Sequence, residues 1–169
     1  MLSLRLSLLL ISVLSLQGCG YHLGYVKPIA YAKIQGIYVP TFQNQTQEPR
    51  SAVMVSNAVI QQFQRDGTYK MANHEQADAI LDGSLVALDR RQARSARFDT
   101  LRTSELDFTL EVTYQFRDLR TNEILDQGTI EGRTSQFLDP NFQLSERQAL
   151  SLAAEKLAEN LVSRLSEGW

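Results

Sequence analysis

A run of strictly alternating apolar and polar residues at positions 105–116 constrains the fold more than any other part of the chain. Its apolar members are Leu106, Phe108, Leu110, Val112, Tyr114 and Phe116, and its polar members are Glu105, Asp107, Thr109, Glu111, Thr113 and Gln115. Successive side chains of a β-strand point to opposite faces. The run therefore predicts a long strand with one buried and one solvated face, and the chain must supply other elements to cover the buried face.

Three further segments are expected to be strands of the same sheet. Residues 79–88 are apolar around Gly83, which indicates a bulge or a close approach by another segment. Residues 33–40 predict a short strand ended by Pro40, because proline cannot donate a hydrogen bond to a sheet ladder. After the turn sequence DLRTNE, residues 124–134 should pair with the long strand as a hairpin. Their predicted inner face holds Ile124, Gly128, Ile130 and Gly132, and their predicted outer face holds Leu125, Gln127, Thr129, Glu131 and Arg133.

A first amphipathic helix is expected after the polar loop TFQNQTQE. Pro49 suits a first helical position, and Gly67 suits the stop after Asp66. Between them the spacing of apolar residues is three and four, as one helical face requires. That face comprises Ala52, Val55, Val59 and Phe63, and it is widened by Val53, Met54 and Ile60. We therefore expect this helix to be deeply buried.

A second amphipathic helix is expected near the C-terminus. Ser145 and Gln148 have the spacing of a capping box, with Leu144 and Ala149 placed to form a hydrophobic staple around it. The apolar side of the helix holds Leu150, Ala153, Leu157, Leu161 and Leu165. The expected order is β-α-β-β-β-α within a single domain at residues 33–169. It predicts an α+β two-layer sandwich, with two α-helices packed on one face of a four-stranded sheet.

The first 19 residues, MLSLRLSLLLISVLSLQGC, have the organisation of a secretory leader. Arg5 precedes an apolar run, and small Gly18 precedes Cys19. The run is too short to span a bilayer, which needs about 20 apolar residues. Residues 1–18 are therefore predicted to be a signal peptide.

Cys19 is the only cysteine, so it cannot form a disulfide within its own chain. A buried thiol and a reactive nucleophile are two possible roles, and a lipid attachment point is the third. The sequence LQGC at residues 16–19 resembles the bacterial lipobox, in which the cysteine is lipidated and becomes the mature N-terminus. We predict lipidation of Cys19, since two or more acyl chains anchor a protein stably.

The residues after the cysteine bear on location. In bacterial lipoproteins an aspartate at the next position tends to favour the inner membrane, whereas this chain has Gly20. The expected location is the periplasmic side of the outer membrane, with the lipid in its inner leaflet. Residues 19–32 form the lipidated N-terminus and a tether without clear periodicity.

Charge and motifs narrow the functional classes. Loss of Arg5 with the leader would leave 16 basic against 19 acidic residues, which argues against general nucleic-acid binding. The chain contains no nucleophile elbow, phosphate-binding glycine loop or zinc-protease motif. His22 and His74 have no second histidine or cysteine at metal-ligand spacing. The acids Glu105, Asp107 and Glu111 fit a solvated strand face better than an acid–base pair. We predict no enzymatic activity, metal or cofactor.

Residues 90–102, RRQARSARFDTLR, concentrate positive charge. Arg90, Arg91, Arg94, Arg97 and Arg102 accompany a single acid, Asp99. We interpret the segment as the loop between the second and third strands. Arginine presents a rigid fork of donors that matches phosphate oxygens. The segment is a candidate site for a phosphorylated glycolipid or an anionic partner surface; the alternative is a loop kept soluble by its charge.

Several segments together resemble the lipopolysaccharide-assembly lipoprotein family, LptE. They are GCGYHL at 18–23, IYVPTFQNQTQEP at 37–49, FQRDG at 63–67, ADAILDGSL at 77–85, DLRTNEIL at 118–125 and AAEKLAENLVSRLSEGW at 153–169. The resemblance implies two helices on a four-stranded sheet, in agreement with the periodicities.

The resemblance also implies partners. It predicts that the domain plugs the lumen of the outer-membrane β-barrel LPS-assembly protein, LptD, and binds lipopolysaccharide without catalysis through basic residues near strand ends. IYVPTFQNQT also resembles lipoproteins that activate peptidoglycan synthases and subunits of secretion channels, which leaves an alternative function.

Overall fold

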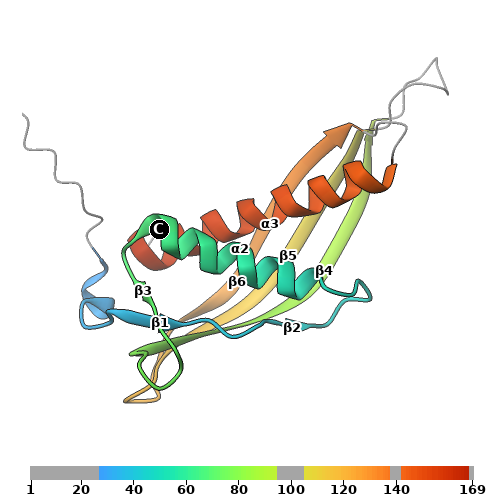
Figure 1. Ribbon diagram of the computed structural model, residues 1–169. Helices are drawn as coiled ribbons and strands as arrows, with labels where there is room; N and C mark the ends of the chain where they lie inside the picture. Colours follow the sequence, from blue (N-terminus) through green and yellow to red (C-terminus); the bar gives the residue numbers. More distant parts are fainter. Residues whose placement is uncertain (1–26, 95–104, 138–141, 168–169) are drawn as a thin grey trace, which may run out of the picture.

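The alternating run forms the central strand of a mixed sheet in the computed structural model, which describes residues 27–94, 105–137 and 142–167. The elements in chain order are the 3-10 helix η1 (Ile29–Tyr31), β1 (Gly36–Tyr38), β2 (Gln43–Asn44), α2 (Ser51–Asp66), β3 (Lys70–Met71), β4 (Ala79–Arg94), β5 (Glu105–Asp118), β6 (Ile124–Phe137) and α3 (Phe142–Glu167). Both long helices lie on one face of the sheet (Figure 1). The predicted α+β sandwich is thus confirmed, with six strands in place of the expected four.

Strand β5 has the two faces that its sequence predicts. The inward side chains of Phe108, Leu110, Val112, Tyr114 and Phe116 are at most 3% exposed. Antiparallel partners flank β5 along its length, β4 on one side and β6 on the other. The outward polar residues of these three strands form a surface on the side away from the helices.

The additional strands come from short segments beside β4. Strand β1 pairs parallel with β4 at Ala79 and Ile80, and β2 pairs parallel with the same strand further along, at Ser84 and Leu85. Pro40 lies between β1 and β2, where it interrupts the ladder before the chain returns to it. The remaining strand, β3, extends the sheet by pairing parallel with β1. The polar loop expected at residues 41–48 therefore contains strand β2.

Helix α2 buries the predicted face, with Ala52, Val55, Val59 and Phe63 at most 3% exposed. It ends as predicted at Gly67, whose φ of +75° is the left-handed conformation that favours glycine. Two details of the prediction are wrong. The N-cap is Arg50 with φ +71°, so Pro49 lies outside the helix. Val53 is 47% exposed, so it does not widen the buried face.

Helix α3 begins at Phe142, three residues before the predicted cap at Ser145. The capping-box prediction is therefore wrong, and the residues before Ser145 are compatible with helix, so the spacing alone does not fix a start. The predicted apolar side is confirmed by its burial: Ala153, Leu157, Leu161 and Leu165 are completely buried. Of the helices in the part of the chain that the structure describes, α3 included, none is long and apolar enough to cross a membrane.

Two glycines allow close packing on the inner sheet face. A Cβ added at Gly132 of β6 would lie 2.1 Å from the Ala153 oxygen and 2.5 Å from the Leu157 nitrogen, both in α3. At Gly83 an added Cβ would lie 2.7 Å from the Phe42 ring. The close approach predicted at Gly83 is confirmed; the bulge in this part of β4 falls between Leu85 and Ala87.

A second bulge reverses a predicted face at the start of β6. The register shifts between Phe116 and Arg117, whose partners are Asp126 and Ile124. Ile124 is consequently 47% exposed, whereas Leu125 packs against the core. The prediction had assigned Ile124 inward and Leu125 outward, since the hydrophobic pattern contains no signal for the extra residue.

The first described residues lie at the end of the sheet formed by the β5–β6 turn. The Tyr31 ring makes an edge contact with Phe116, and its hydroxyl donates to the Leu125 oxygen. The Lys27 ammonium lies 4.5 Å from the centre of the Tyr69 ring. Figure 1 shows η1 and the C-terminal end of α3 at this same end, which we call the turn end.

Candidate functional site

The arginine-rich segment is partly strand, which corrects its interpretation as a loop. Arg90, Arg91 and Arg94 belong to β4, which pairs with β5 as far as Arg94 and Glu105. The prediction ended β4 too early because residues 86–94 lack clean alternation, but pairing with the long strand β5 overrides that weak local preference. Arg97 and Arg102 lie outside the described residues. We call this end of the sheet, opposite the turn end, the arginine end.

The strand geometry separates two neighbouring arginines. Arg90 pairs with inward-facing Phe108 and therefore lies on the helix side, whereas Arg91 pairs with Asp107 on the outer face. The Arg90 guanidinium makes ion pairs of 2.7 Å with both Glu48 and Glu146. The hydrogen bond from Arg90 to Glu48, more than the nearby charge of Glu146, raises the pKa of Arg90.

Arg91 is far more accessible than Arg90. Its side chain is 82% exposed, and it makes an ion pair of 3.8 Å with Asp89. At such exposure an ion pair contributes little to stability. Arg91 can therefore turn toward an anion at small cost. The Arg94 backbone places that residue at the end of the same strand.

The outer face near the arginine end carries mixed charge. A hollow of about 510 Å³ is lined by Asp89, Asp107, Glu111 and Glu131 and by Arg91 and Arg133. Arg133 is already paired with Glu131 on its own strand. Four carboxylates against two guanidinium groups make this surface acidic. Binding of an anion inside this hollow is thus disfavoured.

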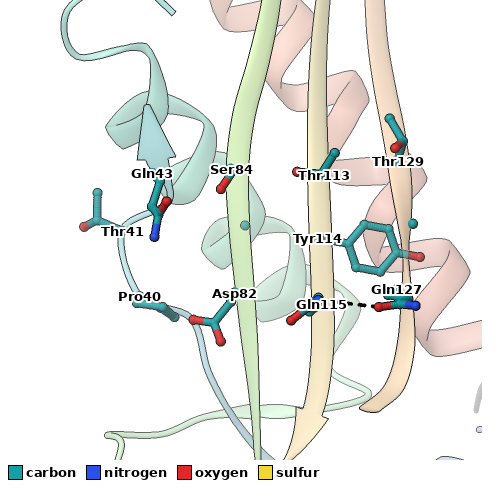
Figure 2. Close-up of a pocket in the computed structure, with 12 residues that line it drawn as sticks. Pro40, Thr41, Gln43, Asp82, Ser84, Thr113, Tyr114, Gln115, Gln127 and Thr129 are labelled. Carbon is teal, nitrogen blue, oxygen red and sulfur yellow. Dashed lines mark hydrogen bonds between the residues drawn. The ribbon is translucent and has the colours of Figure 1, made fainter. Parts of the chain in front are cut away.

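The middle of the outer face is almost uncharged. A hollow of about 910 Å³ lies over β4, β5 and β6, rimmed by residues 40–43. Figure 2 shows side chains that line it. Its side chains are mainly hydroxyls and amides: Thr41, Gln43, Ser84, Thr113, Gln115, Gln127 and Thr129. Asp82 is the charged member, and it pairs with Arg117 at 3.0 Å. A partner could form many hydrogen bonds with this region and would remove water from few charged side chains in doing so. We call it the polar sheet face.

The sequence predicted the β5 and β6 shares of the polar sheet face. The contributions from β4 were hidden because Asp82 and Ser84 lie inside a mainly apolar segment. Thr41 and Gln43 were assigned to a loop that in fact runs along the sheet. Asp82 and Ser84, two positions apart within this apolar segment, were the available signal.

The described residues contain no group of three or more histidine, cysteine or acidic side chains placed to hold a metal ion. His74 is exposed and makes an edge contact with the Tyr38 ring. Cys19 lies outside the described residues, and its lipidation stays a prediction.

Solved structures share this arrangement at low sequence identity. The hypothetical protein CT253 from Chlamydia trachomatis aligns with a TM-score of 0.58 and 10% identity, over 78% of this chain and 95% of that one. A minor lipoprotein from Acinetobacter baumannii aligns with a TM-score of 0.54 and 13% identity, over 79% and 94%. The PelC dodecamer from Paraburkholderia phytofirmans gives 0.53 and 16%, over 83% and 92%. These likenesses show a common fold.

The fold thus defines a class of two-helix α+β domains that includes bacterial lipoproteins. No curated protein matches the chain in a sequence comparison. A sequence model of the LptE family, described as lipopolysaccharide-assembly, matches residues 34–165. The chain belongs to the LptE family, and the resemblance found in its segments is confirmed.

Proposed function

We propose that this protein is an outer-membrane lipoprotein that docks in the lumen of the β-barrel LptD and assists lipopolysaccharide assembly without catalysis. The observation that carries the proposal is the family match over residues 34–165. In this proposal, acyl chains on Cys19 hold the domain at the inner leaflet of the outer membrane, on the periplasmic side.

The polar sheet face supports docking in a barrel. The interior of a membrane β-barrel is polar. A plug for such a lumen needs a surface that hydrogen-bonds broadly without burying unpaired charge. The row of amides and hydroxyls on β4, β5 and β6 meets that requirement. The helix side is occupied by α2 and α3, which leaves the polar sheet face as the docking surface.

The two ends of the sheet support an orientation. Cys19 is eight residues before Lys27, so these two residues are at most about 28 Å apart. Lys27 lies at the turn end, and Glu105 at the arginine end is about 35 Å from Phe116 along β5. The lipid would hold the turn end near the membrane, and the arginine end would project further away.

Arg91, Arg94, Arg97 and Arg102 are the proposed contacts for lipopolysaccharide phosphates. Arg90 has a different role in this proposal, because Glu48 and Glu146 already bind its guanidinium. Replacing the four other arginines with glutamine should weaken lipopolysaccharide binding and flatten its dependence on salt. An unchanged affinity would remove the segment from the mechanism.

Docking is tested by co-purification from outer membranes in mild detergent. Thr113→Arg places a long cation in the middle of the polar sheet face, where Thr113 is exposed. It should abolish recovery of a large β-barrel in equal amount. Gln61→Arg, on the exposed side of α2, is the matched control and should leave recovery unchanged. Recovery of a peptidoglycan synthase in place of a barrel would favour the alternative function.

The anchor has its own test. Mass spectrometry of the purified protein should find residues 1–18 absent and acyl chains on Cys19. An intact leader with a free thiol would refute the anchored arrangement.

A further inference from the structure

Two large apolar side chains are exposed at the turn end of the domain. Ile29 of η1 is 95% exposed, and Ile124 at the start of β6 is 47% exposed. Among the residues that the structure describes, Ile29 is the most exposed large hydrophobic side chain. The Tyr31 hydroxyl donates to the Leu125 oxygen at 3.4 Å, and each isoleucine lies within two residues of that hydrogen bond. Both isoleucines therefore belong to the same end of the sheet.

The segment that carries Ile29 is fixed on both sides. Before it, the Lys27 ammonium lies 4.5 Å from the centre of the Tyr69 ring. After it, the Tyr31 ring makes an edge contact with Phe116, with 5.6 Å between the ring centres. A single exposed isoleucine is ordinary on a protein surface. Ile29 differs because the packing of its neighbours holds it in water, so it would gain free energy from any apolar surroundings within reach.

The length of chain before Lys27 brings a membrane within reach of this end. Lys27 is at most about 28 Å from Cys19, the residue that carries the acyl chains in the proposed function. Ile29 follows Lys27 by two residues. Phe137, another exposed apolar residue, pairs instead with Glu105 at the arginine end. The two isoleucines of the turn end are thus the exposed apolar side chains that a bilayer at Cys19 would meet.

The charges at the turn end are of both signs. Lys33 and Arg120 are exposed there, and so is Glu123 beside Ile124. Arg120 also lies 3.9 Å from the carboxylate of Asp118. An anionic surface would meet carboxylates as well as cations, so charge gives it little preference over a neutral surface. Contact of this end with a bilayer would accordingly depend on apolar burial and change little with salt.

We propose that the turn end rests on the bilayer that holds the acyl chains of Cys19, with Ile29 and Ile124 inserted among the lipid headgroups. This contact depends on the lipid anchor of the proposed function, but it does not depend on docking in a barrel. Apolar side chains at a membrane surface are buried about 5–10 Å into the boundary between headgroups and acyl chains. The contact fixes the orientation of the domain on the membrane, which an anchor on Cys19 alone would not do.

Fluorescence quenching in phosphatidylcholine vesicles tests the contact with the full-length processed protein. Cys19 is the only cysteine and is acylated in this proposal, so Ile124→Cys supplies one free thiol for a fluorophore. The vesicles contain a lipid that carries a quencher either near the headgroup or near the end of the acyl chain. The shallow quencher should act more strongly than the deep one, because insertion reaches only about 5–10 Å. Weak and equal quenching by both would overturn the proposal.

Replacement of Ile29 separates insertion from proximity to the anchor. With the fluorophore at position 124, Ile29→Ser should shift the equilibrium between inserted and free states about tenfold toward the free state, because one apolar side chain is lost from the contact. Quenching should decrease accordingly. Val53→Ser, which replaces an exposed apolar residue of α2, is the matched control and should leave quenching unchanged. Quenching that is the same with Ile29→Ser would show that the anchor alone brings the fluorophore to the membrane, and would overturn the proposal.

Flotation and mass spectrometry keep the contact and the anchor apart. Mass spectrometry verifies the acyl chains on Cys19, flotation of each variant with the vesicles reports attachment, and circular dichroism verifies folding. Acylated protein that floats with the vesicles but whose fluorophore is not quenched would overturn the membrane contact and leave the anchor in place. Protein that does not float would overturn both.

Discussion

Replacing Gly132 with alanine should separate α3 from the sheet. The added Cβ would lie 2.1 Å from the Ala153 oxygen, 2.5 Å from the Leu157 nitrogen and 2.6 Å from the Leu157 Cβ. Two of these three are backbone atoms of a helix, which cannot move by changing a rotamer. The helix must shift by about 1 Å, since contacts between carbon and such atoms need more than about 3 Å. The shift would loosen the packing of Leu157 and Leu161, both fully buried.

The expected loss of stability is about 3 kcal/mol, at the upper end of the range for overpacking a core. For a domain of this size about 3 kcal/mol corresponds to a decrease in Tm of roughly 6–12 °C. Urea denaturation followed by circular dichroism measures the free energy of unfolding, and a thermal scan gives the Tm.

Gly128→Ala is the matched control on the same strand and face. Its added Cβ would lie 3.5 Å from the Tyr114 hydroxyl, an ordinary contact. Alanine also reduces the conformational freedom of the unfolded chain, so this variant should be neutral or more stable by about 0.5 kcal/mol. If both variants unfold at the same urea concentration, the close approach of α3 to β6 does not limit the fold, and the reasoning is refuted.

Three more predictions concern side-chain hydrogen bonds. Ser56→Ala leaves the Phe42 N–H without its 2.8 Å acceptor and should reduce stability by about 1–3 kcal/mol, whereas Ser163→Ala, in a partly exposed pair with Glu167, should change urea denaturation little. Tyr69→Phe removes the donor to the Leu165 oxygen at 2.8 Å. It should lower the free energy of unfolding by about 1–2 kcal/mol, measured by urea denaturation. An unchanged free energy of unfolding would show that this hydrogen bond contributes nothing to stability. Burial raises the pKa of Asp126, but hydrogen bonds from Arg164 and Tyr114 outweigh it and hold the pKa below its ordinary value. The ionised carboxylate thus stabilises the fold above about pH 4, and this contribution is lost as pH falls through the lower folded-state pKa. Asp126→Asn should be less stable at pH 7 and lose less stability on acidification, measured as urea midpoints at pH 7 and pH 3; parallel losses would contradict the assignment.

Periodicity predicted the parts of the fold that bury one continuous face. The inner faces of β5, α2 and α3 follow from spacings of two, three and four, because each is set by burial alone. Gly67 and Gly83 were also informative, since a left-handed φ and a close approach both require glycine. These signals are local, and they determined the sandwich.

The remaining features depend on contacts between distant segments. Strand β2 pairs over two residues with β4, and no pattern of two residues can predict a strand. The bulges beside Leu85 and Leu125 change which side chains face inward without a signal in hydrophobicity. Arg90 and Arg91 lie on opposite faces of the sheet, and this difference becomes clear only once β4 is paired with β5.

The position of α3 has a consequence for biogenesis. This helix covers β5 and β6 and packs against α2, and its residue Leu165 accepts the hydrogen bond of Tyr69. Because synthesis starts at the N-terminus, the apolar faces of β5 and β6 stay exposed until α3 has been synthesised and packs on them. Until then the nascent chain has an incomplete interior and is prone to aggregate. A chaperone that binds exposed apolar surface would therefore be needed until α3 has been made and has packed on the sheet.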